Sequence, residues 1–317
     1  MDAPNAIRIT DVSPRDGLQN EPGHVPTADK LRLIHALADA RVDEIEITSF
    51  VSGAWVPQLG DAEALLALLA GAAERPWASA SGRPTFSALV PNERGLERAL
   101  TSQRAAAAAG MPNLLAKVSV FTAASETFAQ RNTNATIAQT LERFTPVVRS
   151  AHDAGLLVRG YISCAVACPF EGPIAPNAVA DVARRLLDLG VDELDIADTI
   201  GVATPEDIAR VLDALARVRA PRDLTLHLHD TFGRAGACVA RAIAMGVRSF
   251  DSAAGGLGGC PYAGTPERRA PGNIDTAELL AVARAAGLSS RVDPTLLAHA
   301  GTFARSLVQS SARRPAR

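Results

Sequence analysis

Two histidines and an aspartate form the pattern in this sequence that most clearly suggests chemistry. The segment LHLHD alternates as a strand does, which places His227 and His229 on one face, about 7 Å apart along the strand. Two imidazoles on one face can chelate a metal ion, although a pair of hydrogen-bonded core histidines is the alternative. Asp16, in the triplet RDG that follows the first strand-like segment, can supply a third ligand. A carboxylate with imidazoles and water suits Mg²⁺ or Mn²⁺, and Zn²⁺ or Co²⁺ also fits.

Charged residues also end or interrupt other strand-like segments. Arg15 can polarise a carbonyl group, or it can form a surface ion pair with its neighbour. Glu46 lies between two isoleucines, so in a buried strand it would point away from them and need a partner, for which we expect Arg15. Asp198 can serve as a general base or as a carboxylate that orients a ligand, or it can cap the next helix.

A glycine-rich segment, GGLGGCPY, follows the eighth strand-like segment. Its glycines allow the backbone to approach a ligand closely or to move as a lid. Within it, Cys260 is a candidate proton donor or acceptor. Asn273 is expected to begin a helix, either as its N-cap or with a side-chain carbonyl that completes a metal shell. The remaining cysteines lie in apolar or helical stretches, where we expect them to be buried: Cys164, Cys168 and Cys238.

These residues are positioned by eight strand-like segments that alternate with helical patterns. We expect the strands at residues 7–13, 43–48, 85–90, 114–121, 157–163, 192–197, 223–229 and 247–253. We expect helices at residues 27–41, 136–155, 179–190 and 204–218. This alternation predicts an α/β fold, namely a closed (β/α)₈ TIM barrel with a C-terminal helical extension. An open doubly wound sheet is the alternative, but the G-x-G-x-x-G turn of its dinucleotide-binding forms does not follow the first strand.

A closed barrel would bring the candidate residues together. Chemistry in such barrels occurs at the carboxyl ends of the strands. The first and seventh strands both border the eighth, so Asp16 should approach His227 and His229. We expect one domain over residues 1–317, with the barrel core at about 5–285, the helical extension at 286–309 and a frayed tail at 310–317.

Composition argues against several classes of protein. The chain has 317 residues, of which 47% are hydrophobic, enough for the core of one large barrel. The 32 Lys and Arg residues nearly balance the 34 Asp and Glu residues, which argues against a nucleic-acid-binding surface. No apolar run reaches the roughly 18 residues of a membrane span. The start lacks the pattern of a secretory signal, and four cysteines are too few for a disulfide scaffold, so we expect the reducing cytoplasm.

In this order, the segments resemble the hydroxymethylglutaryl-CoA lyases, a family of Arg-Asp-Gly barrel metallolyases. The resemblance covers nearly the whole chain, from SPRDGLQNEP at Ser13 to APGNIDTAEL at Ala270. ITSFVSGAWVPQLGDAE, GYISCAVACPFEG, HLHDTFG and GLGGCPYA lie between these two motifs. Single motifs carry little weight, whereas the ordered set is specific.

The resemblance implies a carbon–carbon lyase that cleaves 3-hydroxy-3-methylglutaryl-CoA into acetyl-CoA and acetoacetate, as in leucine degradation and ketone-body formation. It implies a small-molecule acyl-CoA as the binding partner and a divalent cation, Mg²⁺ or Mn²⁺, as the cofactor. The implied metal ligands are Asp16, His227, His229 and Asn273. We expect neither a nucleic acid nor a membrane as a partner, and we also consider a homodimer.

The resemblance also implies catalytic residues. Arg15 would stabilise the enolate of acetyl-CoA, and Glu46 would orient Arg15. Asp198 and His227 would assist proton transfer, and Cys260 would take part in protonation from a lid. The chemistry agrees with the residues themselves, because the cleavage needs a metal that acidifies the C3 hydroxyl and a cation that stabilises the developing negative charge.

Two features depart from the family pattern. The segment from Cys260 to Asn273 is a few residues longer than the usual loop, and Asp195 stands where the family has Ser. Both bear on the acyl group more than on the reaction type. The alternatives are therefore another 3-hydroxy-3-alkylglutaryl-CoA thioester, or a related barrel aldolase or Claisen condensing enzyme. A non-catalytic barrel that binds metal or CoA is a third alternative, which the loss of Arg15, Asp16 or a strand histidine would have favoured.

Overall fold

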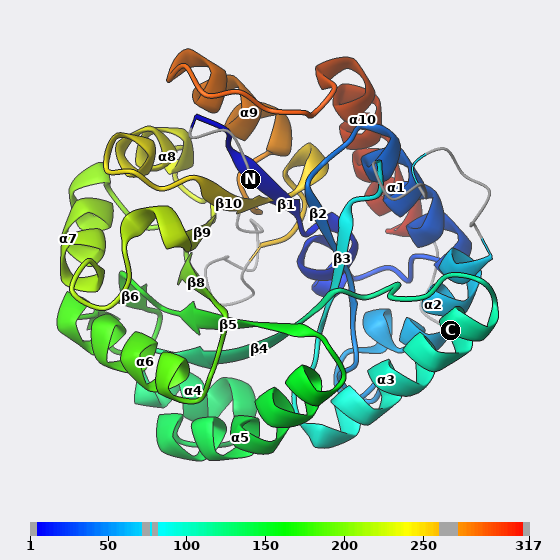
Figure 1. Ribbon diagram of the computed structural model, residues 1–317. Coiled ribbons are helices and arrows are strands. Elements are labelled where there is room, and N and C mark those ends of the chain that lie inside the picture. The colour runs from blue at the N-terminus through cyan, green and yellow to red at the C-terminus, as the bar shows by residue number, and fades with distance from the viewer. Residues whose placement is uncertain (1–4, 72–76, 78–81, 260–271, 313–317) are drawn as a thin grey trace.

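The computed structural model describes residues 5–71, 77, 82–259 and 272–312, and within them eight parallel strands close into a barrel (Figure 1). Around the barrel the order is β1–β10–β9–β8–β5–β4–β3–β2, so β1 and β9 both pair with β10. The predicted (β/α)₈ fold and all eight predicted strands are confirmed. Their bounds are β1 (Arg8–Asp11), β2 (Glu44–Ser49), β3 (Thr85–Leu89), β4 (Lys117–Ala123), β5 (Leu157–Ser163), β8 (Glu193–Asp198), β9 (Leu224–Leu228) and β10 (Ser249–Ser252). β6 (Ala167–Cys168) and β7 (Gly172–Pro173) form a separate antiparallel pair.

Helices surround the barrel on its outer side (Figure 1). In the described residues the α-helices are α1 (Thr27–Asp39), α2 (Ala62–Ala70), α3 (Glu93–Ala108), α4 (Glu126–Thr133), α5 (Ile137–Asp153), α6 (Pro176–Asp188), α7 (Pro205–Leu215), α8 (Ala235–Ala244), α9 (Thr276–Ala285) and α10 (Pro294–Ser311). The four predicted helices are confirmed as α1, α5, α6 and α7. The C-terminal helix α10 ends two residues beyond the predicted end of the extension at residue 309, so residues 310 and 311 are helical and not frayed.

Local sequence explains why these segments fold as they do. β2 is buried at all six positions, as expected of a parallel strand with helices on one face and the barrel interior on the other. α7 begins with a capping box, in which Thr204 and Asp207 each accept a hydrogen bond from the backbone of the other. Its apolar residues recur at helical spacing and are buried toward the barrel: Ile208, Val211, Leu212 and Leu215.

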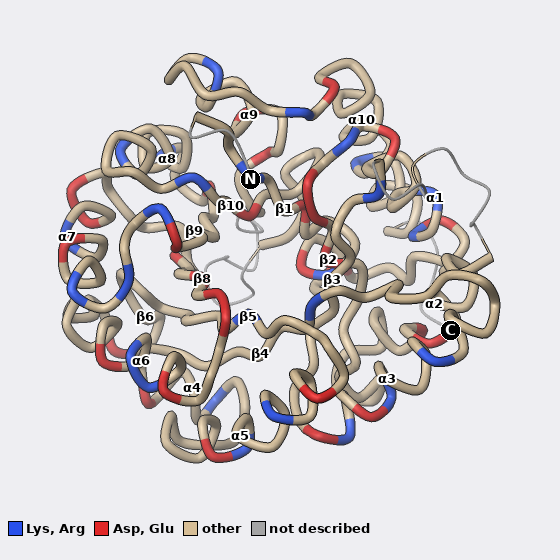
Figure 2. Tube along the Cα trace, viewed as in Figure 1, with Lys and Arg blue, Asp and Glu red and all other residues tan. Residues whose placement is uncertain are grey.

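Charged residues occupy two different environments. Acidic and basic residues intermingle over the outer helices (Figure 2). In the part of the chain that the structure describes, no helix combines the length and the apolar character that a membrane crossing requires. A second group of charges lies at one end of the barrel interior, where most of them are shielded from water.

This second group, which we call the floor network, fills the amino-terminal end of the barrel. Lys117, at the start of β4, lies 2.8 Å from Glu44 and also bonds Glu193. Arg159 of β5 lies 3.2 Å from Glu44 and 3.1 Å from Glu193. Arg8 of β1 lies 2.6 Å from Glu44. Although burial alone would raise it, the three cations hold the pKa of each glutamate below its ordinary value.

We predict that Glu193→Gln destabilises the protein at neutral pH but makes its stability less sensitive to acid. Because the folded-state pKa of Glu193 is depressed, its carboxylate stabilises the fold above the ordinary pKa of 4.5 and loses this effect as the pH falls below that value. Removing one partner of a largely buried pair should lower the free energy of unfolding at pH 7 by about 2 kcal/mol. In urea unfolding, the difference from the parent should shrink between about pH 5 and pH 3.

The matched control is Glu63→Gln, which removes an exposed ion pair with Arg98. This change should alter the free energy of unfolding by about 0.5 kcal/mol or less. If Glu193→Gln lost the same stability at every pH, the floor network would not be the acid-sensitive element.

Candidate active site

Three potential metal ligands converge at the carboxyl end of the barrel. Asp16 lies in η1 (Ser13–Gly17), the turn after β1, while His227 lies near the end of β9 and His229 follows that strand. The Nε2 atoms of His227 and His229 lie 3.9 Å and 3.8 Å from Asp16 Oδ2. One potential ligand atom from each residue falls within a group in which all separations are at most 4.8 Å. The expected approach of the first and seventh strands across the eighth is confirmed.

Hydrogen bonds on the far side of each imidazole fix its orientation. His229 Nδ1 lies 3.2 Å from the backbone oxygen of Asp198, to which it donates when that nitrogen carries the hydrogen. His227 Nδ1 lies 3.2 Å from Asp251 Oδ2. In each ring this leaves Nε2, with its lone pair, on the side of Asp16. Among the described residues, His229 Nε2 is buried with no hydrogen-bond partner, as expected of an atom that binds a cation.

Asn273 joins this group, but it does not begin a helix as predicted. α9 begins at Thr276 with Asp275 as its N-cap, and Asn273 instead forms an isolated antiparallel bridge with His229. Its Nδ2 donates to Asp16 Oδ2 at 2.9 Å and to the oxygen of Leu257 at 3.0 Å. Its Oδ1 is buried and, among the described residues, has no hydrogen-bond partner.

The donor set fits a divalent cation. A carboxylate, two imidazoles and an amide oxygen suit a hard or borderline ion, and two of these donors are otherwise unsatisfied. Gly258 leaves the space, since a Cβ there would lie 2.7 Å from Asn273 Nδ2 and its φ of +110° disfavours other residues. The described part of the glycine-rich segment therefore lies against Asn273 and Asp16.

Arg15 is held beside this group by two carboxylates. Its Nε donates to Glu46 Oε2 at 2.5 Å and its Nη1 donates to Asp16 Oδ1 at 2.6 Å. The predicted partnership of Arg15 with Glu46 is confirmed. Burial opposes the charge of Arg15, but Glu46 and Asp16 outweigh it and raise the pKa of the guanidinium. The result is a fixed, fully charged donor at the edge of the metal-ligand group.

Asp198 does not cap the next helix, which was one of the alternatives for this residue. The N-cap of α7 is Thr204, whereas the Asp198 carboxylate accepts the backbone N–H groups of Ala203 at 2.8 Å and Val202 at 3.3 Å. Burial raises the pKa of this carboxyl group. Asp198 does not line the cavity, and it contacts the metal-ligand group through its backbone oxygen on His229.

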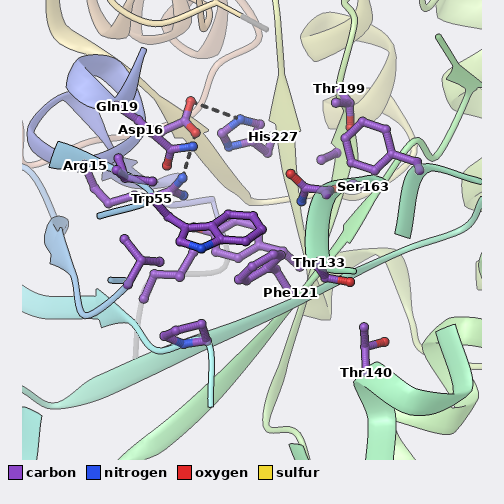
Figure 3. Close-up of a pocket in the computed structure, with 18 of the residues that line it drawn as sticks. Arg15, Asp16, Gln19, Trp55, Phe121, Thr133, Thr140, Ser163, Thr199 and His227 are labelled. Carbon is purple, nitrogen blue, oxygen red and sulfur yellow. Dashed lines mark hydrogen bonds and ion pairs between the residues drawn. The ribbon is translucent and has the colours of Figure 1, made fainter. Parts of the chain in front are cut away.

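A cavity of about 480 Å³ opens beside these residues (Figure 3). Arg15, Asp16 and His227 form its polar end, and Gln19 and Trp55 lie near them. Phenyl rings from β4, α4 and α5 line another part of it: Phe121, Phe128 and Phe144. The cavity can thus hold a ligand with one polar, metal-binding end and a longer apolar or mixed portion.

Two functional candidates, Asp251 and Tyr161, were not recognised in the sequence. Asp251 accepts hydrogen bonds from Tyr161 at 3.0 Å and from Arg159 at 3.3 Å, besides its contact with His227. Asp251 stands in the middle of a strand, so the argument that selected Glu46 would also have found it. Asp195, Asp251 and His227 form a second group compact enough for an ion, but Arg159 and Tyr161 already satisfy Asp251.

Two other expectations concern Asp195 and the cysteines. Asp195 is fully buried and does not line the cavity; burial and the nearby Asp251 raise its pKa well above the ordinary value. Cys260, on the candidate lid, lies outside the described residues. The other cysteines are free and buried, as predicted: Cys164, Cys168 and Cys238.

The chain is similar to known lyases over most of its length. The family model described as HMGL-like matches residues 6–303. A hydroxymethylglutaryl-CoA lyase of Pseudomonas mevalonii is 42% identical over 296 residues, which are 93% of this chain and 90% of the relative. A 3-hydroxy-3-isohexenylglutaryl-CoA/hydroxy-methylglutaryl-CoA lyase of Pseudomonas aeruginosa is 42% identical over 303 residues, which are 95% of this chain and 92% of the relative.

Solved structures agree with this similarity. An HMG-CoA lyase of Brucella melitensis matches with a TM-score of 0.85 and 41% identity, covering 96% of this chain and 99% of that one. An HMG-CoA lyase of Acinetobacter baumannii, in complex with coenzyme A and 3-methylmalate, matches with a TM-score of 0.83 and 32% identity. This match covers 98% of the chain described here and 93% of that chain.

We predict that the protein binds one equivalent of Mn²⁺ and that Asp16→Asn weakens this binding by about 100-fold or more, because a charged ligand oxygen is lost. Isothermal titration calorimetry measures both affinities. The control is Asp230→Asn, because the Asp230 carboxylate follows His229 directly but accepts the N–H of Ala235 at 2.9 Å. The Mn²⁺ affinity of Asp230→Asn should stay close to the parental value. Equal losses in the two variants would place the cation elsewhere.

Proposed function

Because this chain belongs to the HMGL-like family, we propose that it is a divalent-metal-dependent lyase that cleaves 3-hydroxy-3-methylglutaryl-CoA into acetyl-CoA and acetoacetate. The observation that carries the proposal is the convergence of Asp16, His227 and His229 beside the fixed cation of Arg15, at one end of a cavity. A non-catalytic barrel would not require a charged donor held in this position.

The proposed mechanism uses few groups. A divalent cation held by Asp16, His227, His229 and Asn273 would orient the substrate and acidify its C3 hydroxyl. Arg15 would donate to the thioester oxygen, where negative charge develops when the carbon–carbon bond breaks. Glu46 keeps the Arg15 guanidinium in place, so little reorganisation is needed during the reaction.

The mechanism also requires groups that exchange protons with the substrate. The resemblance implied His227 and Asp198 for this step. If His227 binds the metal, neither of its nitrogens is free: Nδ1 contacts Asp251, and Nε2, which lies on the side of Asp16, would bind the cation. The Asp198 oxygens accept two backbone N–H groups. Proton transfer by either residue would therefore require a movement of the ring or of the loop. We propose that, after this movement, one of the two accepts the proton of the C3 hydroxyl, and that Cys260 donates a proton to the product carbon.

The acyl group and the biological setting are further parts of the proposal. The relative named for both isohexenyl and methyl substrates supports a 3-hydroxy-3-alkylglutaryl-CoA with a longer branch as the alternative, and the phenyl-lined part of the cavity could accept it. The relative solved with coenzyme A supports an acyl-CoA as the ligand.

We further propose a cytoplasmic homodimer acting in leucine degradation or ketone-body formation. Free thiols at the three described cysteines support the reducing compartment.

Turnover of defined thioesters tests the proposed function. Purified protein with Mg²⁺ or Mn²⁺ should release acetoacetate from 3-hydroxy-3-methylglutaryl-CoA, lose this activity in EDTA and regain it when metal is restored. Full activity in protein shown to be metal-free by elemental analysis would contradict the metal requirement. Cleavage of the isohexenyl thioester alone would favour the alternative substrate, and cleavage of neither would contradict the lyase proposal.

We predict that one equivalent of iodoacetamide inactivates the enzyme by alkylating Cys260, and that bound substrate slows the reaction. The other three cysteines are buried, which limits the access of the reagent. Burial also raises the pKa of Cys238 to about 12, so its reactive thiolate should form rarely. Peptide mapping identifies the modified residue. Cys260→Ser should lower kcat strongly and leave Mn²⁺ affinity intact, because Cys260 is not a proposed ligand. Parental turnover in Cys260→Ser would exclude its role in proton transfer.

A further inference from the structure

The two side chains expected to act on the substrate, Arg15 and His227, are each held by a buried carboxylate. Glu46 holds Arg15 through Nε, and Asp251 holds His227 through Nδ1. The Tyr161 hydroxyl lies between these carboxylates, 3.0 Å from Asp251 Oδ2 and 3.3 Å from Glu46 Oε2. These contacts form one continuous series, from Arg15 in η1 through β2, β5 and β10 to His227 on β9.

Tyr161 is the central residue of this series of contacts. Its hydroxyl carries one hydrogen and two carboxylates face it, so it can donate to only one of them at a time. The shorter distance favours Asp251. Burial, followed by the charges of Asp251 and Glu46, raises the pKa of Tyr161 well above its ordinary value, so the hydroxyl keeps its hydrogen.

The ring of Tyr161 is itself held in place. It meets the His227 imidazole edge-on, with 6.0 Å between the ring centres. The guanidinium carbon of Arg15 lies 5.5 Å from the centre of the same ring. Tyr161 is buried on β5, a strand that contributes none of the proposed ligands. A shift of Tyr161 would consequently move Arg15 and His227 together.

We infer that Tyr161, with Asp251, is a positioning residue of the reaction: it ties the carboxylate that holds Arg15 to the carboxylate that holds His227, and so fixes the separation of these two groups. The inference rests on the proposed function for its kinetic consequence, but not for its effect on metal binding. Without the hydroxyl, two carboxylates would face each other across an unfilled gap, and repulsion would turn both away from their partners.

Tyr161→Phe tests this inference, because it removes the hydroxyl and keeps the ring contacts. We expect kcat to fall about 10-fold or more, since a displacement of reacting groups well below 1 Å is costly, with KM changed little. Asp251→Asn should weaken Mn²⁺ binding about 10–100-fold, the usual effect of losing the partner of a ligating histidine. Tyr161→Phe should weaken it by a smaller factor in the same direction.

The matched control is Thr225→Val, on the same strand as His227. It removes one buried hydroxyl, which donates to Ser249 Oγ at 2.9 Å. Neither Thr225 nor Ser249 belongs to the series of contacts between Arg15 and His227. Its melting temperature should fall about as much as that of Tyr161→Phe, while kcat and Mn²⁺ affinity stay at the parental values. In a double-mutant cycle, the effects of Tyr161→Phe and Arg15→Lys on kcat should be non-additive, because both residues contact Glu46.

Each outcome decides one question. Tyr161→Phe with parental kcat and Mn²⁺ affinity would overturn the inference. A rise in KM at unchanged kcat would also overturn it, because Tyr161 would then only bind substrate. If Thr225→Val lost as much activity as Tyr161→Phe, the effect would be structural and not positional. If the parent protein cleaved no thioester, the proposed function would fail, while the Mn²⁺ affinities would still test the role of Asp251 and Tyr161.

Discussion

Carboxylates buried inside the barrel can remain ionised only beside a cation or a hydrogen-bond donor, and this constraint organises the rest of the structure. Glu46 is fully buried on β2 and is paired with Arg15, which draws the turn after β1 across the end of the barrel. Asp251 on β10 is paired with Arg159 and Tyr161. Loss of Arg15 or Arg159 would leave a buried carboxylate without its cation, so the side chains at the site have few alternative arrangements.

The same principle joins the site to the segments that cover it. Asp11, the last residue of β1, accepts the N–H groups of Ser13 and Ala254 and the hydroxyl of Thr276. These bonds tie the turn that carries Asp16 to the start of the glycine-rich segment and to α9. Burial raises the pKa of Asp11 to about 6, and these hydrogen bonds only partly offset the cost of burying its charge. One buried residue thus holds together three parts of the chain that lie next to the metal-ligand group.

Sequence reasoning about the site succeeded where it rested on strand alternation. The alternation around Glu46 predicted an inward carboxylate that needs a partner, and Arg15 provides that partner. Applied to β10, the same argument would have identified Asp251. It failed where a residue lies in irregular structure. Asn273 was expected to begin a helix, but a bridge to His229 and bonds to Leu257 place it, and neither contact has a local sequence signal.

The sequence by itself determined the alternation of strands and helices and the shared face of His227 and His229, because both follow from local periodicity. It also determined which residue types could bind a metal. The sequence predicted that Asp16 approaches these histidines only through the expected barrel. The tertiary structure decided how close they lie, because their separation depends on closure of the barrel and on the position of β10 between β1 and β9. It likewise decided that the carboxylate of Asp198 turns into its own loop, since burial made backbone N–H groups its nearest partners.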